Sequence, residues 1–480
     1  MKQFVFTLVP SVQLCEKNGS FFLLSKFPLR LLRINRELYL ILTELGKGSN
    51  IEEVIDRHKI TNISQVIELL ITLVARGYLH LRITGNPAEY PRVSIIVPVR
   101  DQSEKLKECV KSLQELSYPR DKYEIIVVDD GSVIPVKQEV MDANIRIIRF
   151  DRSRGPAAAR NSGFVHSSGE ILGFLDADCC ADKNWLNELI PFFQIMTIGV
   201  IGGFVDSYYN IKFLERYEKV NSPLNLGNNL IFQIENASTF YVPSCNMLVS
   251  RQAFTAIGGF NEELQVGEDV DLCWRLRDKG YLTIYVPAGK VSHKHRSKLS
   301  QMMKRRFDYG TSESILYNLH KNRKKNLIFP IWSGLALITM LISILLLNPL
   351  PLSCLPLFLA LDFWFKTKAL TVKITPISFL VVFRSWIALG YSLSFHLLRY
   401  YMMLLILAGI FYYPVWILGL IIFVFCSITD YTVKKPALFY PVFGFYYLVE
   451  HLAYQMGVFW GCIKRLKFRS YLVSLCIRRH

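Results

Sequence analysis

The sequence predicts a three-part chain with a small N-terminal domain, an α/β domain built on a parallel sheet, and a C-terminal helical membrane region. Between residues 92–326, short apolar runs alternate with amphipathic stretches, which is typical of a doubly wound sheet. Long apolar runs fill residues 327–463 and predict membrane-associated helices. A Pro-containing linker at 86–91 sets apart residues 1–85, and a basic tail occupies residues 464–480.

Positive charge is concentrated beside the apolar region. The formal net charge is +17, and basic residues cluster just before residue 327 and again in the tail. Such clusters mark the cytoplasmic side of membrane spans and attract anionic lipid. We therefore expect a multi-pass protein of the cell membrane that contacts membrane lipid and keeps its α/β domain in the cytoplasm. No nucleic-acid-binding motif accompanies the charge, so we expect no nucleic-acid partner.

The cysteines predict a reducing compartment. None of the ten Cys residues belongs to a Cys-x-x-Cys pair, and Cys179 and Cys180 are adjacent, which does not suit a disulfide framework. We expect reduced thiols and no zinc site. Residues 1–6 contain no apolar core long enough for a signal peptide, so we expect none.

Residues 1–85 have the pattern of a small mixed domain. Asn35 is the expected N-cap of a helix with apolar residues at helical spacing, and Gly46 and Gly48 are expected to end it. The order of strands, three helices and a closing strand resembles a winged-helix fold. The other expected elements are strands at 4–9, 21–24 and 77–81 and helices at 51–58 and 64–76.

The same segment carries a second resemblance. The strings LLRINRELYLILTELGKGSNIEEV and VIELLITLVARGYL are similar to the PqqD-like peptide chaperones. Members of that family bind a leader peptide along a strand edge, so the resemblance implies a peptide-recognition domain. The alternative interpretation is a regulatory or packing domain.

Two acids, Asp176 and Asp178, directly follow the apolar strand expected at 171–175. Residues two apart leave a strand on the same face, and ligands of open α/β sheets bind at the carboxyl ends of strands. Carboxylate oxygens bind hard divalent cations. The pair therefore indicates a metal–diphosphate site, against the alternative of two acids on a solvated loop. The other expected strands of this domain lie at 93–98, 123–129, 145–150 and 283–286, with a helix at 103–116.

Five motifs in order carry a specific resemblance, namely VSIIVPVRD, IIVVDDGS, GPAAARNSG, GEILGFLDAD and GEDVDLCWRLRDKGY. The series resembles the family-2 glycosyltransferases of the GT-A fold and covers most of residues 93–300. The resemblance implies a Rossmann-like catalytic domain, a UDP-sugar donor, and Mg²⁺ or Mn²⁺ as cofactor. Sugar transfer requires that the diphosphate leaving group is neutralised and the acceptor hydroxyl loses its proton.

The resemblance implies roles for residues near the nucleotide. Asp130 would contact the uracil or the ribose, and Pro98 to Asp101 would flank the base. The family often has Asn-Glu after the first strand, where this chain has Asp101 and Gln102. This departure puts one expected base contact in doubt.

The metal site is also implied by the resemblance. Asp178 would bind the ion that carries the diphosphate, and Asp176 would lie on the ribose or the ion. A His near residue 293 often completes the shell, and His293 is favoured over His295. Arg160 would hold the nucleotide end, with a surface ion pair as the alternative.

The second acidic cluster is Glu268-Asp269 at the start of an expected helix. By resemblance, Asp269 is the catalytic base, with Glu268 beside it as a second candidate. A single base opposite the leaving group implies an inverting displacement. The alternative is that both acids stabilise the helix dipole.

Two apolar segments, 327–347 and 401–426, are the clearest expected spans, and 350–365, 375–395 and 436–460 are weaker. We expect about four spans with both ends cytoplasmic, or about two or three if the weak segments are interfacial. Processive synthases often carry Gln-x-x-Arg-Trp here, and QMMKRRF matches only approximately, so long-chain synthesis is not favoured.

A PqqD-like segment, a family-2 catalytic domain and a hydrophobic tail in one chain resemble the glycosyltransferases of the mycofactocin system. That resemblance implies transfer of glucose from a UDP-sugar to the peptide-derived redox cofactor mycofactocin, its precursor premycofactocin or the precursor peptide. Two alternatives stay open. One is a membrane polysaccharide or glycolipid synthase of the same family. The other is a peptide-binding scaffold with an inactive transferase domain.

Overall fold

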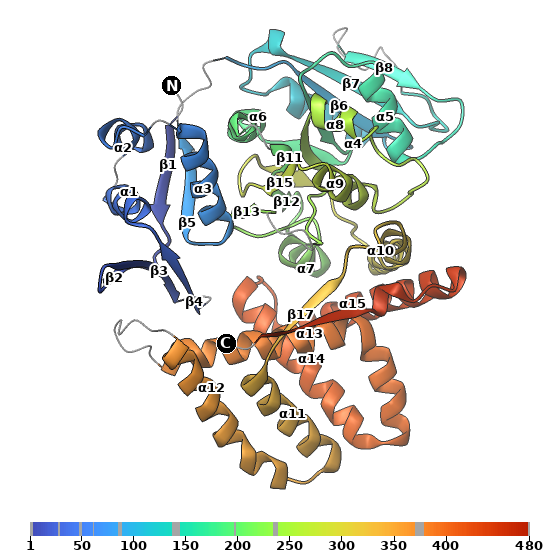
Figure 1. The fold of residues 1–480 in the computed structure, drawn as a ribbon. Coiled ribbons are helices and arrows are strands. Elements are labelled where there is room, and N and C mark those ends of the chain that lie inside the picture. Colours follow the sequence, from blue (N-terminus) through green and yellow to red (C-terminus); the bar gives the residue numbers. More distant parts are fainter. Residues whose placement is uncertain are drawn as a thin grey trace. The chain divides into compact units, whose positions relative to one another are not determined.

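The computed structural model describes residues 3–26, 29–47, 50–60, 62–84, 89–136, 145–195, 198–233, 239–369 and 379–478. Its elements follow one another along the chain as labelled in Figure 1. The chain divides into two compact units. The first consists of residues 1–4, 81–302 and 315–323, and the second consists of residues 5–80, 303–314 and 324–480.

Residues 3–84 contain two small sheets and three helices. The elements are β1 (Gln3–Leu8), β2 (Val12–Lys17), β3 (Ser20–Lys26), β4 (Leu29–Ile34), α1 (Arg36–Gly46), α2 (Ile51–Arg57), α3 (Ile63–Ala75) and β5 (Leu79–Thr84). β1 pairs with β5, and β2, β3 and β4 form an antiparallel sheet. The expected N-cap of α1 is confirmed, because the side chain of Asn35 accepts a hydrogen bond from the Leu38 N–H at 2.9 Å. Gly48 and residues 86–88 of the expected linker lie outside the described residues.

Strand β2 was not expected from the sequence. It pairs with β3 along its whole length. The turn between the two strands is Asn18-Gly19, and both residues have a positive φ, of 50° and 69°. Asn-Gly is the strongest short-range signal for a two-residue hairpin. The turn residues, rather than the weak alternation of the strand, could therefore have predicted β2.

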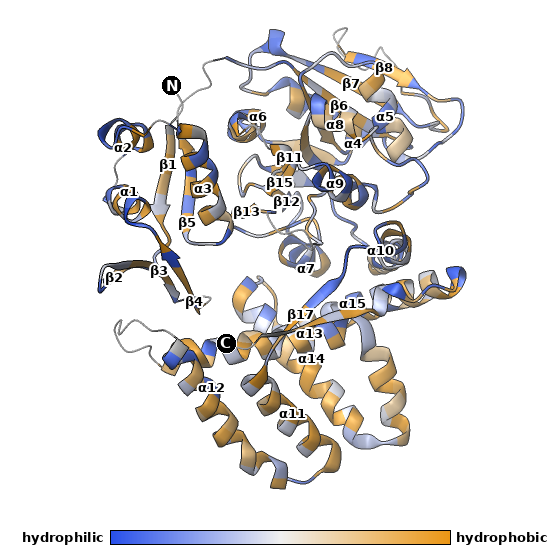
Figure 2. Cartoon of the chain, viewed as in Figure 1, coloured by the Kyte–Doolittle hydropathy of each residue, from blue (hydrophilic) through white to orange (hydrophobic). Residues whose placement is uncertain are grey.

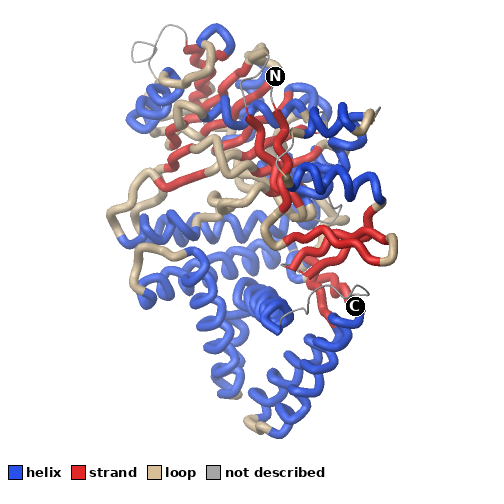
Figure 3. Tube along the Cα trace, turned by 90° about the vertical axis from the view of Figure 1, so that its left-hand side faces the viewer, coloured by secondary structure: helices blue, strands red, loops and turns tan. Residues whose placement is uncertain are grey.

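The first unit is built on an eight-stranded sheet of order β13-β15-β11-β14-β9-β6-β7-β8. Figure 3 shows these strands running side by side. The strands are β6 (Val93–Val99), β7 (Tyr123–Asp129), β8 (Ile145–Arg149), β9 (Ile171–Leu175), β11 (Ile198–Gly202), β13 (Ile231–Phe232), β14 (Asn246–Ser250) and β15 (Leu282–Tyr285). The expected α/β domain is confirmed.

The expectation of a parallel sheet is wrong for part of the sheet. β6 to β9 pair in parallel, but β14 is antiparallel to both β9 and β11, and β13 is antiparallel to β15. Short apolar strands look the same in either direction, because burial rather than direction sets their composition. Antiparallel β14 nevertheless places its residues directly opposite β9, whose five residues are all buried.

The first unit also contains a smaller, three-stranded sheet of order β10-β16-β12. Its strands are β10 (Cys179–Ala181), β12 (Val205–Ser207) and β16 (Val291–His293). α5 packs on β6 and β7, while α8 packs on β11 and β14. The helices of this unit are α4 (Ser103–Gln114), α5 (Pro156–Val165), α6 (Trp185–Leu189), α7 (Phe213–Asn221), α8 (Arg251–Ala256) and α9 (Glu268–Asp278). The residues of α10 (Leu299–Leu319) are divided between the two units.

The C-terminal part is mainly helical and strongly apolar, as the orange colour of its helices in Figure 2 shows. Its helices are α11 (Ile331–Leu346), α12 (Leu355–Ala369), α13 (Phe379–Phe411), α14 (Tyr413–Lys434) and α15 (Tyr440–Arg465). Within the described residues, three helical stretches are long and apolar enough to cross a membrane, namely Leu350–Lys368, Phe379–Phe411 and Tyr413–Lys434. This composition confirms a membrane-associated region.

The expected positions of the spans need correction. The segment 327–347 is not a full span, because β17 (Lys325–Pro330) occupies its start and α11 has only 16 residues. The segment 401–426 is divided between α13 and α14, since Pro414 lies in the first turn of α14. The weaker segment 350–365 belongs instead to a candidate span. Residues 375–378 lie outside the described residues.

The last expected span, 436–460, forms α15 but is not among the candidate spans. Its charged Glu450 is buried, and Arg306 Nε of the same unit lies 3.4 Å from Glu450 Oε1. A charge paired within protein in this way makes α15 less suited to face lipid. Part of the expected basic tail forms a strand, since β18 (Val473–Arg478) pairs in parallel with β17.

Candidate active site

The carboxyl end of β9 holds the first acidic cluster. β9 is fully buried between β6, to which it is parallel, and β14, to which it is antiparallel. These two pairings fix the point at which the chain leaves the sheet after Leu175. Asp176 and Asp178 follow directly after it. Asp178 is buried, and a buried carboxylate needs a charged or hydrogen-bonding partner. The contacts of Asp178 therefore define the site.

Asp178 lies beside His293 because two short strands are in register. β10 is antiparallel to β16, and Cys179 stands opposite His293 in this pairing. His293 Nε2 lies 3.4 Å from Asp178 Oδ1. One possible ligand atom from each of Asp178, Cys179 and His293 lies within 4.8 Å of the others. Carboxylate, imidazole and thiol groups are all metal ligands, so this cluster could hold a divalent ion.

His295 lies beside His293 and close to a different carboxylate. Its Nδ1 is 3.2 Å from His293 Nδ1 and 3.8 Å from Glu218 Oε2. The contact between the two rings leaves His293 Nε2 directed at Asp178, which is the geometry a metal-binding imidazole needs. Of the two candidate histidines, the geometry favours His293.

Arg160 joins the first acidic cluster to the second. Its two terminal nitrogens donate to Asp176 Oδ1 at 2.7 Å and to Glu268 Oε1 at 2.9 Å. The side chain is only 3% exposed, so it does not form the surface ion pair considered as an alternative. Burial lowers the pKa of Arg160, but the charges of Asp176 and Glu268 outweigh burial and raise this pKa. Arg160 therefore stays a cation. Its guanidinium also lies over the Phe260 ring at 5.5 Å.

The second cluster begins helix α9. Gly267 precedes the helix with φ +85°, a conformation that favours glycine, and the first helical residues are Glu268 and Asp269. Asp269 accepts hydrogen bonds from the backbone N–H groups of Val270 at 2.8 Å and Ser244 at 3.3 Å. Burial, followed by the charge of Glu268, raises the pKa of Asp269 to about 7. A carboxyl group with a near-neutral pKa is well suited to accept a proton.

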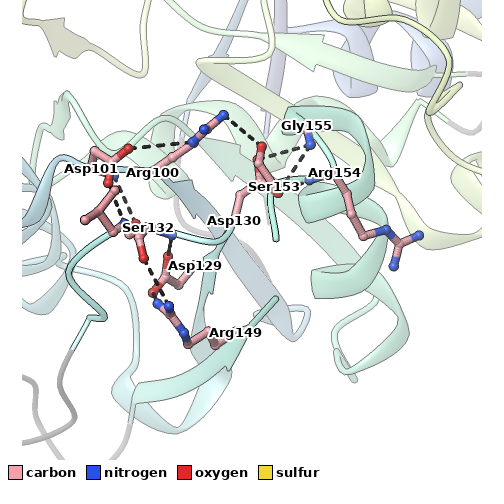
Figure 4. A network of polar contacts seen from close by, with 10 residues as sticks. Arg100, Asp101, Asp129, Asp130, Ser132, Arg149, Ser153, Arg154 and Gly155 are labelled. Atoms are coloured by element: carbon pink, nitrogen blue, oxygen red, sulfur yellow. Dashed lines mark hydrogen bonds and ion pairs between the residues drawn. The ribbon is translucent and has the colours of Figure 1, made fainter. Parts of the chain in front are cut away.

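Asp130 ties the end of β7 to the loop before α5, as Figure 4 shows. Its carboxylate accepts hydrogen bonds from Ser153 Oγ at 2.7 Å and from the backbone N–H groups of Arg154 at 2.6 Å and Gly155 at 3.1 Å. Gly131 follows with φ +67°, and a Cβ there would lie 2.6 Å from the backbone of residues 152 and 153. Asp130 therefore shapes the loop on the expected nucleotide side.

Asp101 and Asp129 belong to the same polar network (Figure 4). Asp101 accepts a hydrogen bond from the Val133 N–H at 2.8 Å. Asp129 is fully buried and binds Arg149 at 2.5 Å and the Ser132 N–H at 2.9 Å. Burial opposes ionisation, but these contacts hold the pKa of Asp129 below its ordinary value. Pro98 lies half-buried in β6, opposite Val128 of β7, so it stands at the same edge of the sheet.

Sequence reasoning missed three residues of this region, namely Cys179, Lys105 and Asp129. Cys179 belongs to the metal-ligand cluster, and Lys105 Nζ lies 3.7 Å from Asp178 Oδ2. In the sequence, only the position of Cys179 directly after Asp178 indicates that it lies near the metal-ligand cluster. Nothing in the sequence pairs a residue of α4 with Asp178, because that contact depends on how the helix packs. Burial raises the pKa of Cys179 well above its ordinary value.

The α/β domain that carries these two acidic clusters matches a known family model. Residues 94–258 match the family model described as "Glycosyl transferase family 2". This part of the chain is therefore similar to the family-2 glycosyltransferases.

A curated relative narrows the comparison. The chain is 32% identical over 265 residues to "Pre-mycofactocin glycosyltransferase" of Mycobacterium tuberculosis, a match covering 54% of this chain and 55% of the relative. It is also 28% identical over 238 residues to "Glycosyltransferase AglE" of Haloferax volcanii, covering 48% of this chain and 76% of that protein. The chain thus spans about half the length of the mycobacterial relatives that it matches. Over that half, the chain is similar to this glycosyltransferase.

Solved structures resemble the chain more distantly. A mannosyltransferase from Pyrobaculum calidifontis, solved in complex with GDP-Man and Mn²⁺, is 17% identical with a TM-score of 0.38. That match covers 63% of this chain and 86% of the mannosyltransferase. A chain of S. aureus TarS in complex with UDP-GlcNAc is 15% identical with a TM-score of 0.36, covering 48% of this chain and 72% of that one.

Replacing Arg160 tests its bridging position. Arg160→Met is expected to destabilise the protein by about 3 kcal/mol, because it leaves Glu268 and Asp176 without their cation inside the site. Arg154→Met is the matched control, because the ion pair between Arg154 and Glu262 is exposed and contributes less than about 1 kcal/mol. Thermal unfolding of both variants measures the difference. Equal melting temperatures for the two variants would show that the bridge is not important for stability.

Proposed function

We propose that the chain transfers glucose from UDP-glucose to premycofactocin or a related peptide-derived acceptor, with inversion at the sugar. One observation carries the proposal. Asp178, with His293, and Asp269, with Glu268, form two acidic clusters that Arg160 links in one site. A nucleotide-sugar transferase needs one group to hold the diphosphate and another to deprotonate the acceptor.

The first cluster fits a divalent metal ion. Asp178 offers a carboxylate oxygen and His293 an imidazole nitrogen, which suits Mn²⁺ and also allows Mg²⁺. Asp178 and His293 would hold the ion, and Asp176, bound to Arg160, would lie beside it. When bound, the ion would neutralise charge on the diphosphate leaving group. Cys179 offers a sulfur atom to the same cluster.

The second cluster supplies the base. Asp269 in its ionised form would take the proton of the acceptor hydroxyl as that oxygen attacks the anomeric carbon. Its hydrogen bonds from Ser244 and Val270 hold the carboxylate in place. Arg160 would act as a positioning residue, because it holds Glu268 at the base and Asp176 at the donor. A single base on the face opposite the leaving group gives inversion.

The nucleotide would lie at the carboxyl ends of β6 and β7. The carboxylate of Asp130 already binds Ser153 and Gly155, so we assign it first to shaping the loop that borders the nucleotide. Asp101 and Pro98 stand at the same edge and would flank the base. The uracil preference rests on the resemblance of the motifs in this region.

The acceptor assignment rests on the mycobacterial relative and on residues 1–85. We infer that this segment is PqqD-like and recognises a peptide or a peptide-derived group along a strand edge. β2 and β4 are the outer strands of its three-stranded sheet, which suits β-augmentation. The catalytic domain would lie in the cytoplasm, with the C-terminal helices crossing the membrane more than once.

A donor assay tests the proposed function. Purified full-length protein in nanodiscs is incubated with Mn²⁺ and, separately, labelled UDP-glucose, UDP-N-acetylglucosamine or GDP-mannose, and nucleotide release is measured with and without premycofactocin. We expect release from UDP-glucose that premycofactocin stimulates. Nucleotide release from GDP-mannose alone would contradict the assignment of UDP-glucose as the donor. No release from any donor would favour an inactive transferase domain.

Removing residues 1–85 tests the peptide-recognition role. We expect the truncated protein to bind UDP as tightly as the full chain but to show at least about a tenfold higher KM for the acceptor, because a binding surface separate from the donor site is lost. Isothermal titration with UDP and initial rates with premycofactocin measure the two effects. An unchanged KM would reject the recognition role, and lost UDP binding would show that the truncation damages the catalytic domain.

A further inference from the structure

One face of helix α4 lies along the segment that carries Asp176 and Asp178. Lys105, Glu108, Cys109 and Ser112 recur at helical spacing, so their side chains leave α4 on one side. Cys109 Sγ donates to the backbone oxygen of Asp176 at 3.8 Å, and Ser112 Oγ accepts from the Ala181 N–H at 3.0 Å. These contacts hold the second and third turns of α4 against the segment that follows β9, and Lys105 lies on the same side of the helix, in the turn before them.

We propose that Lys105 is a second cation for the diphosphate of the nucleotide sugar, acting beside the metal-binding Asp178. This inference rests on the proposed function and adds a donor-binding residue to it. Lys105 stands outside the five motifs on which the family resemblance rests. Its placement comes from the packing of α4.

The charges around Lys105 direct its ammonium group to this site. Glu104 is bound by Lys107 at 2.8 Å, and Glu108 is bound by Lys294 at 2.6 Å, so the acids of the same helix have other partners. Among the contacts of the described residues, the carboxylate that Lys105 approaches is Asp178, at 3.7 Å.

The contact with Asp178 leaves the ammonium group able to bind a ligand. A distance of 3.7 Å is too long for a hydrogen bond, and a lysine ammonium has three donors. The side chain is 34% exposed, so a ligand can reach it. Phosphate oxygens brought to Asp178 by a metal ion would come within reach of these donors.

The chemistry of transfer gives this cation a task. The diphosphate of a nucleotide sugar carries two negative charges, which one divalent ion balances, and a third negative charge develops on the leaving oxygen as the glycosidic bond breaks. A lysine acts as a point charge that follows a phosphate, and its attraction grows in a partly water-excluded site. Lys105 would therefore bind the free nucleotide diphosphate as well as the sugar donor.

A different role for Lys105 makes the opposite prediction. If the lysine only neutralised Asp178, it would compete with the metal ion and contribute nothing to nucleotide binding. Removing it would then strengthen metal binding and leave UDP affinity equal or higher. The two roles are therefore separated by measuring UDP and Mn²⁺ binding on the same variants.

The experiment uses the full-length protein in nanodiscs with Lys105→Gln, Lys105→Arg and the control Lys107→Gln. Titration with UDP at saturating Mn²⁺ is expected to show an affinity lower by about ten- to a hundredfold for Lys105→Gln, with partial recovery in Lys105→Arg. Lys107→Gln should stay within about twofold, because its ion pair is exposed. Electron paramagnetic resonance of Mn²⁺ without UDP should show binding that is not weakened in Lys105→Gln.

Equal UDP affinity in Lys105→Gln and the wild type would overturn the inference while leaving the proposed function in place. A loss of UDP affinity matched by an equal loss of Mn²⁺ affinity without UDP would also overturn it, since the lysine would then act through the metal site. A wild-type protein that binds no UDP would overturn the proposed function itself, and the inference with it.

Discussion

Asp269→Asn is expected to lower the transfer rate by about a thousandfold, which is within the range lost when a general base is removed. Asparagine keeps the size of the side chain, and its one amide oxygen can accept one of the two hydrogen bonds that Ser244 and Val270 donate to different oxygens of Asp269. It cannot take a proton from the acceptor. The turnover number with UDP-glucose and premycofactocin should fall, while the UDP affinity measured by titration should stay unchanged.

Glu263→Gln is the matched control for this variant, because Glu263 is an exposed acid in the segment just before α9. It should retain wild-type turnover. Full activity in Asp269→Asn would show that another group is the base, and Glu268→Gln would then be the variant to test. Loss of UDP binding in Asp269→Asn would point to a donor role instead.

The pH dependence gives a second test of Asp269. Burial and the charge of Glu268 raise its pKa to about 7, and only the ionised form can act as a base. Activity should therefore rise as pH increases through about 7 and should be low at acidic pH, where the carboxyl group is protonated. A rate that is flat between pH 5.5 and 8.5, roughly one and a half units on each side of that pKa, would contradict this assignment.

Asp178→Asn is expected to weaken Mn²⁺ binding by at least about a hundredfold, and transfer should fall with it. The amide lacks the negative charge that pairs with the ion, while His293 keeps its position in β16. Electron paramagnetic resonance of Mn²⁺ measures the affinity directly, independently of turnover.

Asp206→Asn is the control for the metal site. Asp206 lies in β12, the strand that pairs with β16, but its partners are Lys290 and Lys219. It should bind Mn²⁺ as the wild type does. If Asp178→Asn and Asp206→Asn behaved alike, the ion would not be held at the end of β9.

The acidic clusters could be predicted from the sequence because each follows a local pattern. An apolar run that ends in Asp176 and Asp178, and a glycine followed by Glu268 and Asp269, are each visible within a few residues. A buried strand needs apolar residues along its whole length, so apolar runs in the sequence predicted strands β6, β7 and β9 at nearly their observed positions.

The contacts that join these patterns could not be predicted. Arg160 binds acids that lie 16 and 108 residues away in the chain, and Lys105 reaches Asp178 only because α4 packs against β10. The direction of β14 was also missed, because a buried strand has the same composition in a parallel or an antiparallel pair. These features depend on tertiary packing.

The membrane region was predicted in kind but not in detail. Hydropathy identified the apolar composition, but not that residues 325–330 would pair as a strand with the C-terminal tail. Likewise, Pro414 separates two long helices where a single span was expected, since proline is well accommodated in the first turn of a helix. Composition therefore located the region, and local backbone chemistry set its boundaries.

The most direct test of the proposed reaction is mass spectrometry of the product. The full-length protein in nanodiscs is incubated with UDP-glucose, Mn²⁺, premycofactocin and the lipids of the nanodisc, and both the soluble and the lipid fractions are examined. We predict premycofactocin carrying an added hexose, formed by the wild type and not by Asp269→Asn. A hexose found on lipid or on a growing glucan, with premycofactocin unmodified, would contradict the account and identify a glycolipid or polysaccharide synthase.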